Sequence, residues 1–301
     1  MSKAFENLPA AEMYKAIRTK KIKLNKKRCE PGVKLCEGDV LELYIKDEFL
    51  TERGEANGFL SISPRLNILY EDENIILCDK KPGMTVHDCE GADLNNLINH
   101  ICSYLYKKGE YDPMRENSFA PALCNRLDRN TGGIVISAKN AESLRLLNEK
   151  IKKGEIERTY LALVHGILGK KEDILTAYHK KNEKDNLAII RKDSFAGAKI
   201  IKTKYIVLKE KDETSLVKVS LLTGRTHQIR AHFAFIGHPV VGDGKYGGGG
   251  ERARADRKKG FYSQALYSYR LKFDFLGDSG KLDYLTGKSF EVKDVDFAKQ
   301  F

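Results

Sequence analysis

Long hydrophobic runs are missing from this 301-residue sequence, and so is any pattern that would direct the chain to a membrane. A membrane-spanning helix needs about 20 consecutive, mostly apolar residues, and no window of the sequence comes near that length. The first ten residues lack the charged-then-apolar pattern of a secretion signal. We therefore expect a cytoplasmic protein without a membrane partner.

Closely spaced cysteines are also missing. No pair has the Cys-x-x-Cys spacing, so neither a zinc site nor a redox motif is predicted. In a chain without a secretion signal we expect free thiols, with Cys78 and Cys124 in the core because their neighbours are apolar. The six cysteines are Cys29, Cys36, Cys78, Cys89, Cys102 and Cys124.

Basic residues outnumber acidic ones, 53 to 42, which gives a formal net charge of +11. Solubility alone can explain such a global excess, but local clustering favours a polyanion, because from Lys15 to Arg28 eight residues are basic and none is acidic. Closely spaced cations suit RNA phosphates, and each contact gains affinity by releasing counterions. The residues expected to bind RNA are Lys20, Lys21, Lys23, Lys26, Lys27 and Arg28.

The hydrophobic pattern predicts two domains, and 41% hydrophobic residues suffice for a core. In the first, a helix places Met13, Tyr14 and Ile17 on one side, and polar residues 51–65 predict a linker. In the second, short apolar strands mix irregularly with a few helices, which favours an α+β fold with a mixed, mainly antiparallel sheet. Asn140 is placed to cap a helix. The predicted helices are 10–18, 94–106, 141–153 and 226–236, and the predicted strands are 22–24, 40–45, 74–77, 133–136, 160–164 and 216–222.

Three polar segments are candidates for chemistry. The first, Asn125–Gly133, places Asp128 between Arg126 and Arg129. Adjacent positive charge keeps a carboxylate ionised, as a nucleophile or general base requires. A structural ion pair is the commoner explanation of this pattern when it stands alone.

The second segment, Thr223–His232, turns at Gly224 and enters a helix near Thr226, on which Thr226 and Arg230 would share a face. An arginine held there could pair with a carboxylate from another loop. Histidines at spacings of five and six match no common metal-binding helix, so we predict no metal and expect core or hydrogen-bonding roles. These histidines are His227, His232 and His238.

The third segment, Glu157–Gly166, is a predicted strand with Tyr160 ahead of its apolar run. A tyrosine in that position is more often a core residue than a catalytic one. A Gly-x-Gly-x-x-Gly pattern also occurs at Gly242–Gly247, but it opens no clear helix, so a dinucleotide site is not predicted.

In their order and spacing, these segments resemble the large-subunit (RluA-type) pseudouridine synthases. The resemblance covers about residues 66–275 and rests on the stretches LYEDENIILCDKKPGMTVH, NRLDRNTGGIVISAKN, RTYLALVHG, TGRTHQIRAH and IGHPVVGDGKYG. It implies an enzyme that isomerises specific uridines in structured RNA. Such a reaction involves no redox change and no group donor, so we expect no cofactor.

The resemblance also implies roles for three catalytic residues. Asp128 would be the catalytic aspartate, acting as nucleophile or proton acceptor at the sugar or the base. Tyr160 would stack on the uracil and take part in proton transfer. Arg230 would pair with the aspartate and keep it charged in a dry pocket.

Three further residues would bind the substrate. Arg126 would help to occupy the space that a flipped uridine leaves, Ile229 would pack near the base, and Arg129 would flank the aspartate. The family often has His where this chain has Asn125, Ser where it has Gly132, and Lys where it has Arg158. These departures bear on target choice more than on activity.

The N-terminal helix, basic turn and EGDVLELYI strand resemble, over about forty residues, the RNA-binding module named after ribosomal protein S-four. The module usually has further residues before this helix, so here it is expected to be N-terminally clipped. The predicted domains are thus 1–60, an S-four-like RNA-binding domain with its linker, and 61–301, a catalytic domain.

The expected partner is RNA, with ribosomal RNA favoured and transfer RNA possible, and the protein is expected to be a monomer. Two other functions fit parts of the pattern. A non-enzymatic RNA-binding or ribosome-assembly protein would explain the basic segment. A glycoside hydrolase also attacks a glycosidic bond, but it usually needs two carboxylates, and the three segments offer no convincing second one.

Overall fold

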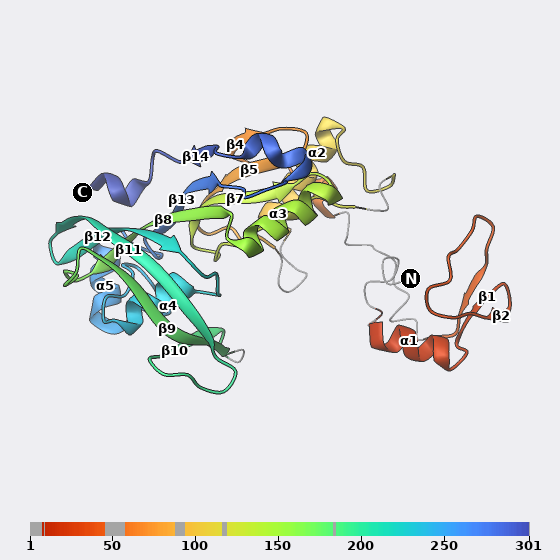
Figure 1. The fold of residues 1–301 in the computed structure, drawn as a ribbon, viewed down its shortest axis with the longest axis horizontal. Helices are drawn as coiled ribbons and strands as arrows, with labels where there is room; N and C mark the ends of the chain where they lie inside the picture. Colours follow the sequence, from red (N-terminus) through yellow and green to blue (C-terminus); the bar gives the residue numbers. More distant parts are fainter. Residues whose placement is uncertain are drawn as a thin grey trace. The chain divides into compact units, whose positions relative to one another are not determined.

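The structure, a computed structural model, describes Leu8 and residues 10–45, 58–87, 94–115, 119–182 and 185–300. Cys89 and the first part of the expected linker lie outside these ranges. The chain divides into two compact units, Met1–Ser61 and Ile62–Phe301 (Figure 1).

In the smaller unit a helix packs against a three-stranded antiparallel sheet of order β2–β1–β3. The helix has the predicted bounds, and Ala16, Ile17 and Ile22 form the core. Tyr14 is 54% exposed, so the apolar face of the helix is narrower than predicted. The elements are α1 (Ala10–Arg18), β1 (Ile22–Leu24), β2 (Lys27–Arg28), β3 (Leu41–Leu43) and η2 (Gly58–Ser61).

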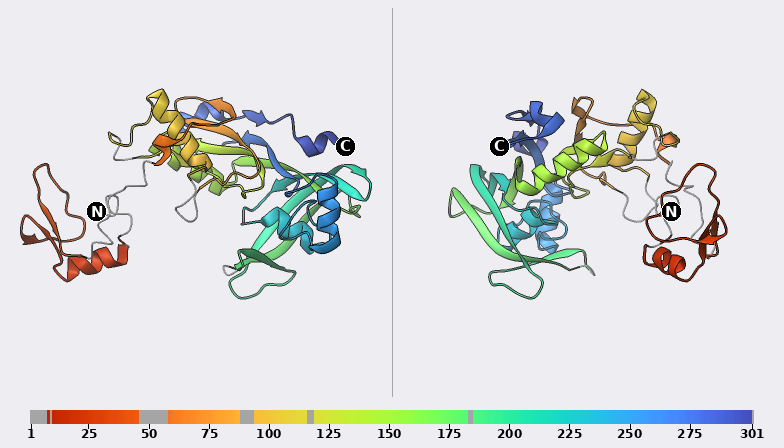
Figure 2. Two further views of the ribbon diagram at one scale, coloured as in Figure 1. Left: turned by 180° about the vertical axis from the view of Figure 1, so that it is seen from behind. Right: turned by 45° about the vertical axis from the view of Figure 1, so that its right-hand side comes forward.

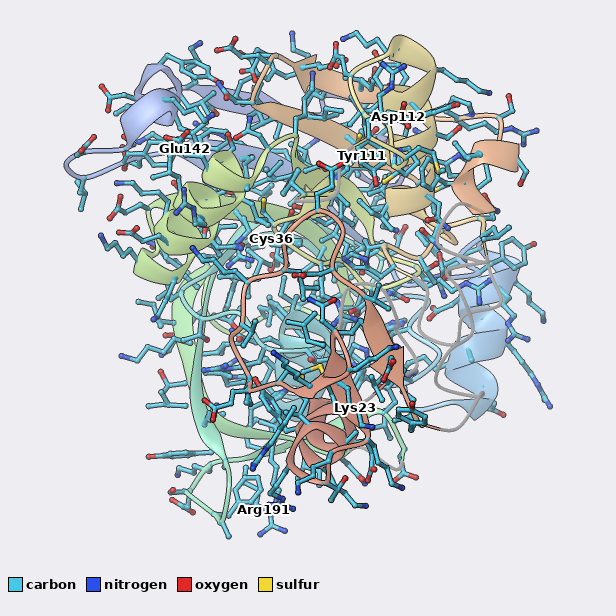
Figure 3. The ribbon with its side chains drawn as sticks, turned by 90° about the vertical axis from the view of Figure 1, so that its right-hand side faces the viewer. Lys23, Cys36, Tyr111, Asp112, Glu142 and Arg191 are labelled. Carbon is cyan, nitrogen blue, oxygen red and sulfur yellow. The ribbon has the colours of Figure 1, made fainter. Side chains whose placement is uncertain are left out.

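The basic segment of this unit surrounds the turn between β1 and β2. Lys20, just after α1, and Lys26, in the turn between β1 and β2, have positive φ angles of 62° and 66°, which are uncommon for residues other than glycine. Lys23 is labelled in Figure 3. Its ammonium lies 5.2 Å from the centre of the Tyr44 ring. Lys23 is half-buried there, and the other five residues expected to bind RNA are exposed.

The larger unit is built on an 11-stranded sheet of order β10–β9–β11–β12–β8–β13–β7–β5–β4, with β14 beside β13 and β6 beside β7. Within the described ranges, only β7 and β13 pair in parallel. This confirms the expected mixed, mainly antiparallel α+β fold. The strands are β4 (Ile68–Glu71), β5 (Ile75–Lys80), β6 (Ala122–Leu123), β7 (Gly132–Ala138), β8 (Ile156–His165), β9 (Glu172–Asn182), β10 (Leu187–Arg191), β11 (Lys199–Lys211), β12 (Thr214–Leu221), β13 (Leu266–Phe273) and β14 (Ser289–Glu291).

Helices cover parts of this sheet. Helix α3 (Ala141–Lys153) has the predicted bounds, and the Asn140 side chain caps it by accepting the Ser143 N–H at 2.9 Å; it packs beside β7 (Figure 2). Helix α4 (Gln228–Phe235) begins two residues later than predicted, so Thr226 precedes it and shares no helical face with Arg230. The others are α2 (Leu97–Lys108), α5 (Gly250–Lys258), η3 (Gly280–Leu285) and η4 (Asp296–Gln300).

The main hydrophobic core joins the elements that carry the three polar segments. Leu127 from the loop before β7, Tyr160 from β8 and Ile229 from α4 are all buried in one cluster with Val135 and Phe233. Burying each large side chain contributes roughly 1.5–3 kcal/mol, so these three segments are held together by packing. No helix in the described ranges is both long and apolar enough to cross a membrane.

Candidate active site

A pocket of about 970 Å³ opens in the larger unit. The catalytic and substrate-binding residues predicted in that part of the chain all line it, although they come from three distant segments. They are Asp128, Tyr160 and Arg230, together with Arg126, Arg129 and Ile229. The basic residues of the smaller unit do not belong to its lining.

Asp128 sits in a loop between β6 and β7 that backbone contacts hold rigid. Its carbonyl accepts the Thr131 N–H at 3.0 Å. The Asn125 amide bridges β7 by donating to the Ile134 carbonyl and accepting the Ile136 N–H. At Gly132, where the family often has Ser, an added Cβ would lie 2.4 Å from the Tyr267 ring, so glycine there leaves space for that ring.

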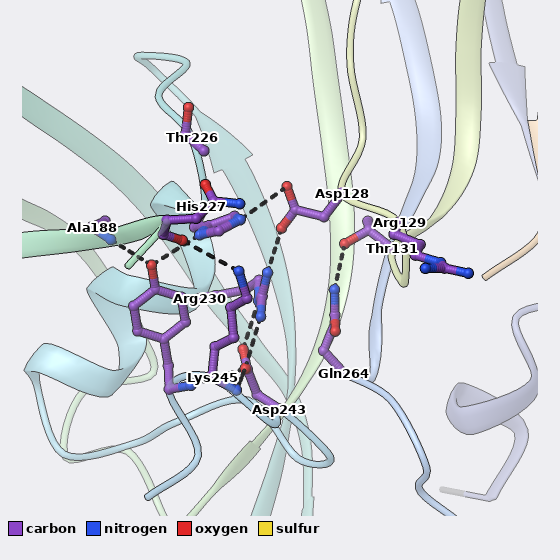
Figure 4. Close-up of polar contacts among 12 residues, drawn as sticks. Asp128, Arg129, Thr131, Ala188, Thr226, His227, Arg230, Asp243, Lys245 and Gln264 are labelled. Atoms are coloured by element: carbon purple, nitrogen blue, oxygen red, sulfur yellow. Dashed lines mark hydrogen bonds and ion pairs between the residues drawn. The ribbon is translucent and has the colours of Figure 1, made fainter. Parts of the chain in front are cut away.

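Arg230 joins two carboxylates. Its Nη1 donates to Asp128 Oδ2 at 2.7 Å, while Nε and Nη2 donate to the two oxygens of Asp243 at 2.7 and 2.9 Å (Figure 4). Burial alone would lower the pKa of Arg230, but the two carboxylates raise it above its ordinary value. Burial would raise the pKa of Asp243, but Arg230 outweighs it and holds that pKa below the usual range. Arg230 and Asp243 are therefore both ionised at neutral pH.

The flanking arginines do not provide this pairing. Arg129 Nε donates to the Gly83 carbonyl at 3.0 Å, and none of the ion pairs among the described residues connects Asp128 with Arg126 or Arg129. The interpretation of Asp128 as a carboxylate held between its sequence neighbours is thus wrong. Arg129 bonds a backbone carbonyl instead, and an arginine 102 positions away forms the ion pair with Asp128.

His227 faces the second oxygen of Asp128, with its Nε2 3.8 Å from Oδ1. Tyr246 Oη accepts the Ala188 N–H at 2.7 Å, so its own proton is free to bond His227 Nδ1 at 3.0 Å. When the tyrosine donates in this way, the neutral ring carries its proton on Nε2, toward Asp128 (Figure 4). Burial lowers the pKa of His227, which favours this neutral form.

The other two histidines of the segment make hydrogen bonds, as expected. His232 Nδ1 lies 3.0 Å from Thr203 Oγ1, and His238 Nδ1 lies 2.8 Å from the His165 carbonyl oxygen. No three His, Cys, Asp or Glu side chains in the described ranges are grouped so that they could hold a metal ion.

Tyr160 is buried on β8, with 4% of its surface exposed. Burial raises the pKa of its hydroxyl, and the nearby Arg158 charge partly offsets that effect. The hydroxyl is therefore protonated at neutral pH, so it can donate a proton or a hydrogen bond, and the ring offers an apolar face to the pocket.

Three residues of the site were assigned no role from the sequence. Asp243 and Tyr246 belong to the Gly-x-Gly-x-x-Gly segment, whose turn is closed by Asp243 Oδ1 accepting the N–H groups of Lys245 and Tyr246. An acidic residue between two glycines was the available signal. Lys80 also escaped notice: its ammonium donates to the carbonyl of Arg129, next to Asp128, and burial lowers its pKa to about 8.

Comparison with known proteins accounts for this arrangement. The model of the RNA pseudouridylate synthase family matches residues 74–235. The chain belongs to that family. A ribosomal large subunit pseudouridine synthase C of Buchnera aphidicola subsp. Schizaphis graminum is 33% identical over 258 residues, or 82% of this chain and 75% of the relative. An uncharacterized RNA pseudouridine synthase of Mycoplasma capricolum is 30% identical over 311 residues, which cover 99% of this chain and 93% of the relative.

Solved structures show the same fold at lower identity. The human RNA pseudouridylate synthase domain-containing 4 protein aligns with a TM-score of 0.59 and 19% identity, over 77% of this chain and 89% of its own. The human RNA pseudouridylate synthase domain-containing 1 protein aligns with a TM-score of 0.56 and 21% identity, over 79% of this chain and 96% of its own. As a member of the family, the protein is an RNA pseudouridine synthase rather than a glycoside hydrolase. In agreement, Asp128 is the single carboxylate among the described residues that line the pocket.

Proposed function

We propose that Asp128 is the catalytic residue of this pseudouridine synthase and that its substrate is a uridine flipped out of structured RNA. The observation that carries the proposal is one half-buried carboxylate in a basic pocket, 2.7 Å from a buried arginine. The reaction breaks the bond between N1 of uracil and C1′ of ribose. The uracil then turns, C5 bonds to C1′, and the proton that C5 loses is balanced by one gained at N1.

Asp128 suits either the attack on the sugar or base, or the removal of the C5 proton. In both cases the carboxylate must be charged and fixed in direction. Arg230 supports both requirements, because it holds one oxygen of Asp128 and is itself anchored by two bonds to Asp243. A preorganised charge pair of this kind stabilises developing charge without rearrangement.

Flipping explains the remaining pocket residues. A stacked uridine cannot reach Asp128, and unstacking costs a few kcal/mol, least in loops. Arg126 is exposed at the pocket and is suited to occupy the vacated space, while the buried Ile229 and the Tyr160 ring offer apolar surface to the base. Arg129, exposed beside them, would meet the RNA backbone.

The proposed target is ribosomal RNA of the large subunit, because the Buchnera aphidicola relative has the ribosomal large subunit in its name. Transfer RNA is the alternative. We further propose that residues 1–60 form an S-four-like RNA-binding domain with its linker and that 61–301 form the catalytic domain. The exposed basic residues around the β1–β2 turn support the first assignment. A cytoplasmic location, a monomeric state and a reaction without cofactor stay predictions.

The test is to isolate RNA from cells that lack the protein and to map its pseudouridines. We expect one or a few positions of large-subunit ribosomal RNA to contain uridine, and re-expression of the wild-type protein to restore them. A loss confined to transfer RNA would correct the target. An unchanged pseudouridine map in all RNA would contradict the proposed function.

A further inference from the structure

Two buried polar atoms in the pocket wall lack a hydrogen-bond partner among the described residues, namely Arg158 Nε and Thr85 Oγ1. Buried polar groups in folded proteins are almost always paired, so each exception calls for a missing partner. The steps proposed for Asp128, Tyr160 and Arg230 use neither atom. The arginine is the more informative of the two, because its unpartnered Nε belongs to a charged guanidinium.

Arg158 lies close to where the target nucleotide would sit. It is two residues before Tyr160 on β8, so the two side chains leave the same face of the strand about 7 Å apart. The tip of its guanidinium rests against Gly224, where an added Cβ would come within 3.3 Å of Nη2. Gly224 therefore leaves room for the guanidinium at the pocket wall.

The charge of the pocket indicates what the missing partner is. Seven cationic side chains line it against one carboxylate, Asp128, which Arg230 already holds. A buried guanidinium N–H without an acceptor is unfavourable, and a neutral uracil carbonyl would not offset the excess positive charge around it. A phosphate supplies both the charge and two oxygens that match the guanidinium fork. The cationic residues are Arg126, Arg129, Arg158, Lys181, Arg225, Arg230 and Lys245.

We propose that Arg158 binds a phosphate that flanks the target uridine. This inference rests on the proposed function and adds a binding contact to it. Once the glycosidic bond breaks, the uracil is free to turn, and C1′ must stay in place until C5 reaches it. A fixed phosphate on the same nucleotide keeps the ribose within bonding distance, which is the advantage of holding reactants in position.

The experiment pairs a protein variant with a change in the RNA. A stem–loop that contains the target uridine is made with a neutral methylphosphonate at each phosphate within two nucleotides of it. Affinity is measured by filter binding, and the rate by single-turnover formation of pseudouridine. With wild-type protein, one flanking position should weaken binding at least about tenfold, since a hydrogen bond to a charged group is worth roughly 1.5–3 kcal/mol.

Arg158→Gln should bind unmodified RNA with about the same loss of affinity as wild-type protein shows for the methylphosphonate RNA. The methylphosphonate at that position should then cause no further loss in the variant. Arg158→Lys keeps the charge without the fork and should retain part of the penalty. Lys181→Gln, which removes another charge from the same pocket, should keep the full penalty at that position. Thermal unfolding of each variant checks its fold.

The proposal is overturned if, at every methylphosphonate position, the loss of affinity is the same for Arg158→Gln as for the wild-type protein. Arg158 would then contact no phosphate. If Arg158→Gln does not fold, an unchanged penalty in Arg158→Lys at every position overturns it instead. The proposed function is judged separately, by whether wild-type protein forms pseudouridine in unmodified RNA. Failure there leaves the binding comparison valid.

Discussion

At the scale of single residues, the site depends on how Arg230 distributes its nitrogens. Two of them hold Asp243, whose side chain is fully buried, and one holds Asp128, whose side chain is 25% exposed. The buried carboxylate therefore fixes the arginine, and the arginine fixes the carboxylate that faces the pocket. Charge alone is not enough for this task, because one group must reach two partners in different directions.

Arg230→Lys tests that requirement. Lysine keeps the positive charge but has one nitrogen in place of three, so it can satisfy Asp243 or Asp128 but not hold both. We expect the single-turnover rate at saturating RNA to fall about 10- to 100-fold, which corresponds to losing one hydrogen bond between charged groups. Affinity for RNA should change little. A large loss of affinity with an unchanged rate would instead make Arg230 a phosphate contact.

At this scale the sequence predicted which residues gather but not all of their partners. The predicted six pocket residues do meet, and the pairing of Arg230 with Asp128 followed from the family resemblance. The role of Asp243 could not be predicted, because it depends on a turn that brings the residue against α4. No local sequence pattern encodes that contact. The expected ion pair between Asp128 and its neighbouring arginines is not formed, because Arg129 bonds the Gly83 carbonyl and Arg230 from α4 holds the carboxylate.

At the scale of elements, helix α3 shows how a local rule can be tested alone. Asn140→Ala removes the side-chain oxygen that accepts the Ser143 N–H at the start of the helix, and with it the NH2 group that donates to Asn74 at 3.2 Å. Losing such a cap costs about 1 kcal/mol. Urea unfolding should show that loss, while the rate of pseudouridine formation stays unchanged because α3 contributes nothing to the pocket lining. Equal stability of variant and wild type would contradict the capping role.

Helix α4 should make the fold sensitive to acid. Burial, aided by the charge of His179, lowers the pKa of His232 to about 4, whereas in the unfolded chain it is near 6.5. The unfolded chain therefore binds a proton first as the pH falls. Stability from this group is complete above pH 6.5 and declines toward pH 4, by up to about 3 kcal/mol.

Unfolding by urea between pH 7 and pH 4 measures this effect. His232→Gln should be less sensitive to acid than wild type over that interval, since glutamine does not titrate. Parallel pH profiles for the two proteins would show that His232 is not the group responsible.

The elements that the sequence predicted best were those with strong local signals. Helix α3 has a clear apolar period and a capping asparagine, and its bounds were correct. Strand β11 was not predicted, because exposed lysines such as Lys202 and Lys204 alternate with its buried residues and dilute the hydrophobic run. Strand β13 gains its place from pairing with β7 and β8, and such long-range pairing is invisible to a local pattern.

At the scale of the whole molecule, the smaller unit and its basic segment should strengthen binding without affecting chemistry. Changing Lys21, Lys27 and Arg28 to Gln removes three exposed charges and leaves Lys23 on its tyrosine. RNA affinity should fall, and the slope of log affinity against log salt should flatten by about 0.7–0.9 per lost phosphate contact. The rate at saturating RNA should not change.

The matched control for this variant removes three lysines from the C-terminal region, Lys281, Lys288 and Lys299. It lowers the net charge equally, so any general effect of charge appears in both proteins. If the two triple variants have the same affinity and salt slope, the basic segment is a solvated surface, and the pocket-lining cations must supply the RNA contacts.

The central claim is that Asp128 performs the isomerisation, and Asp128→Asn tests it most directly. Asparagine has nearly the same shape, but it supplies neither the charge nor a competent nucleophile or base. Tritium release from RNA labelled at C5 of uridine should fall below detection, while thermal unfolding shows a folded protein and filter binding shows nearly wild-type affinity. Substantial tritium release by the folded Asp128→Asn protein would contradict the account.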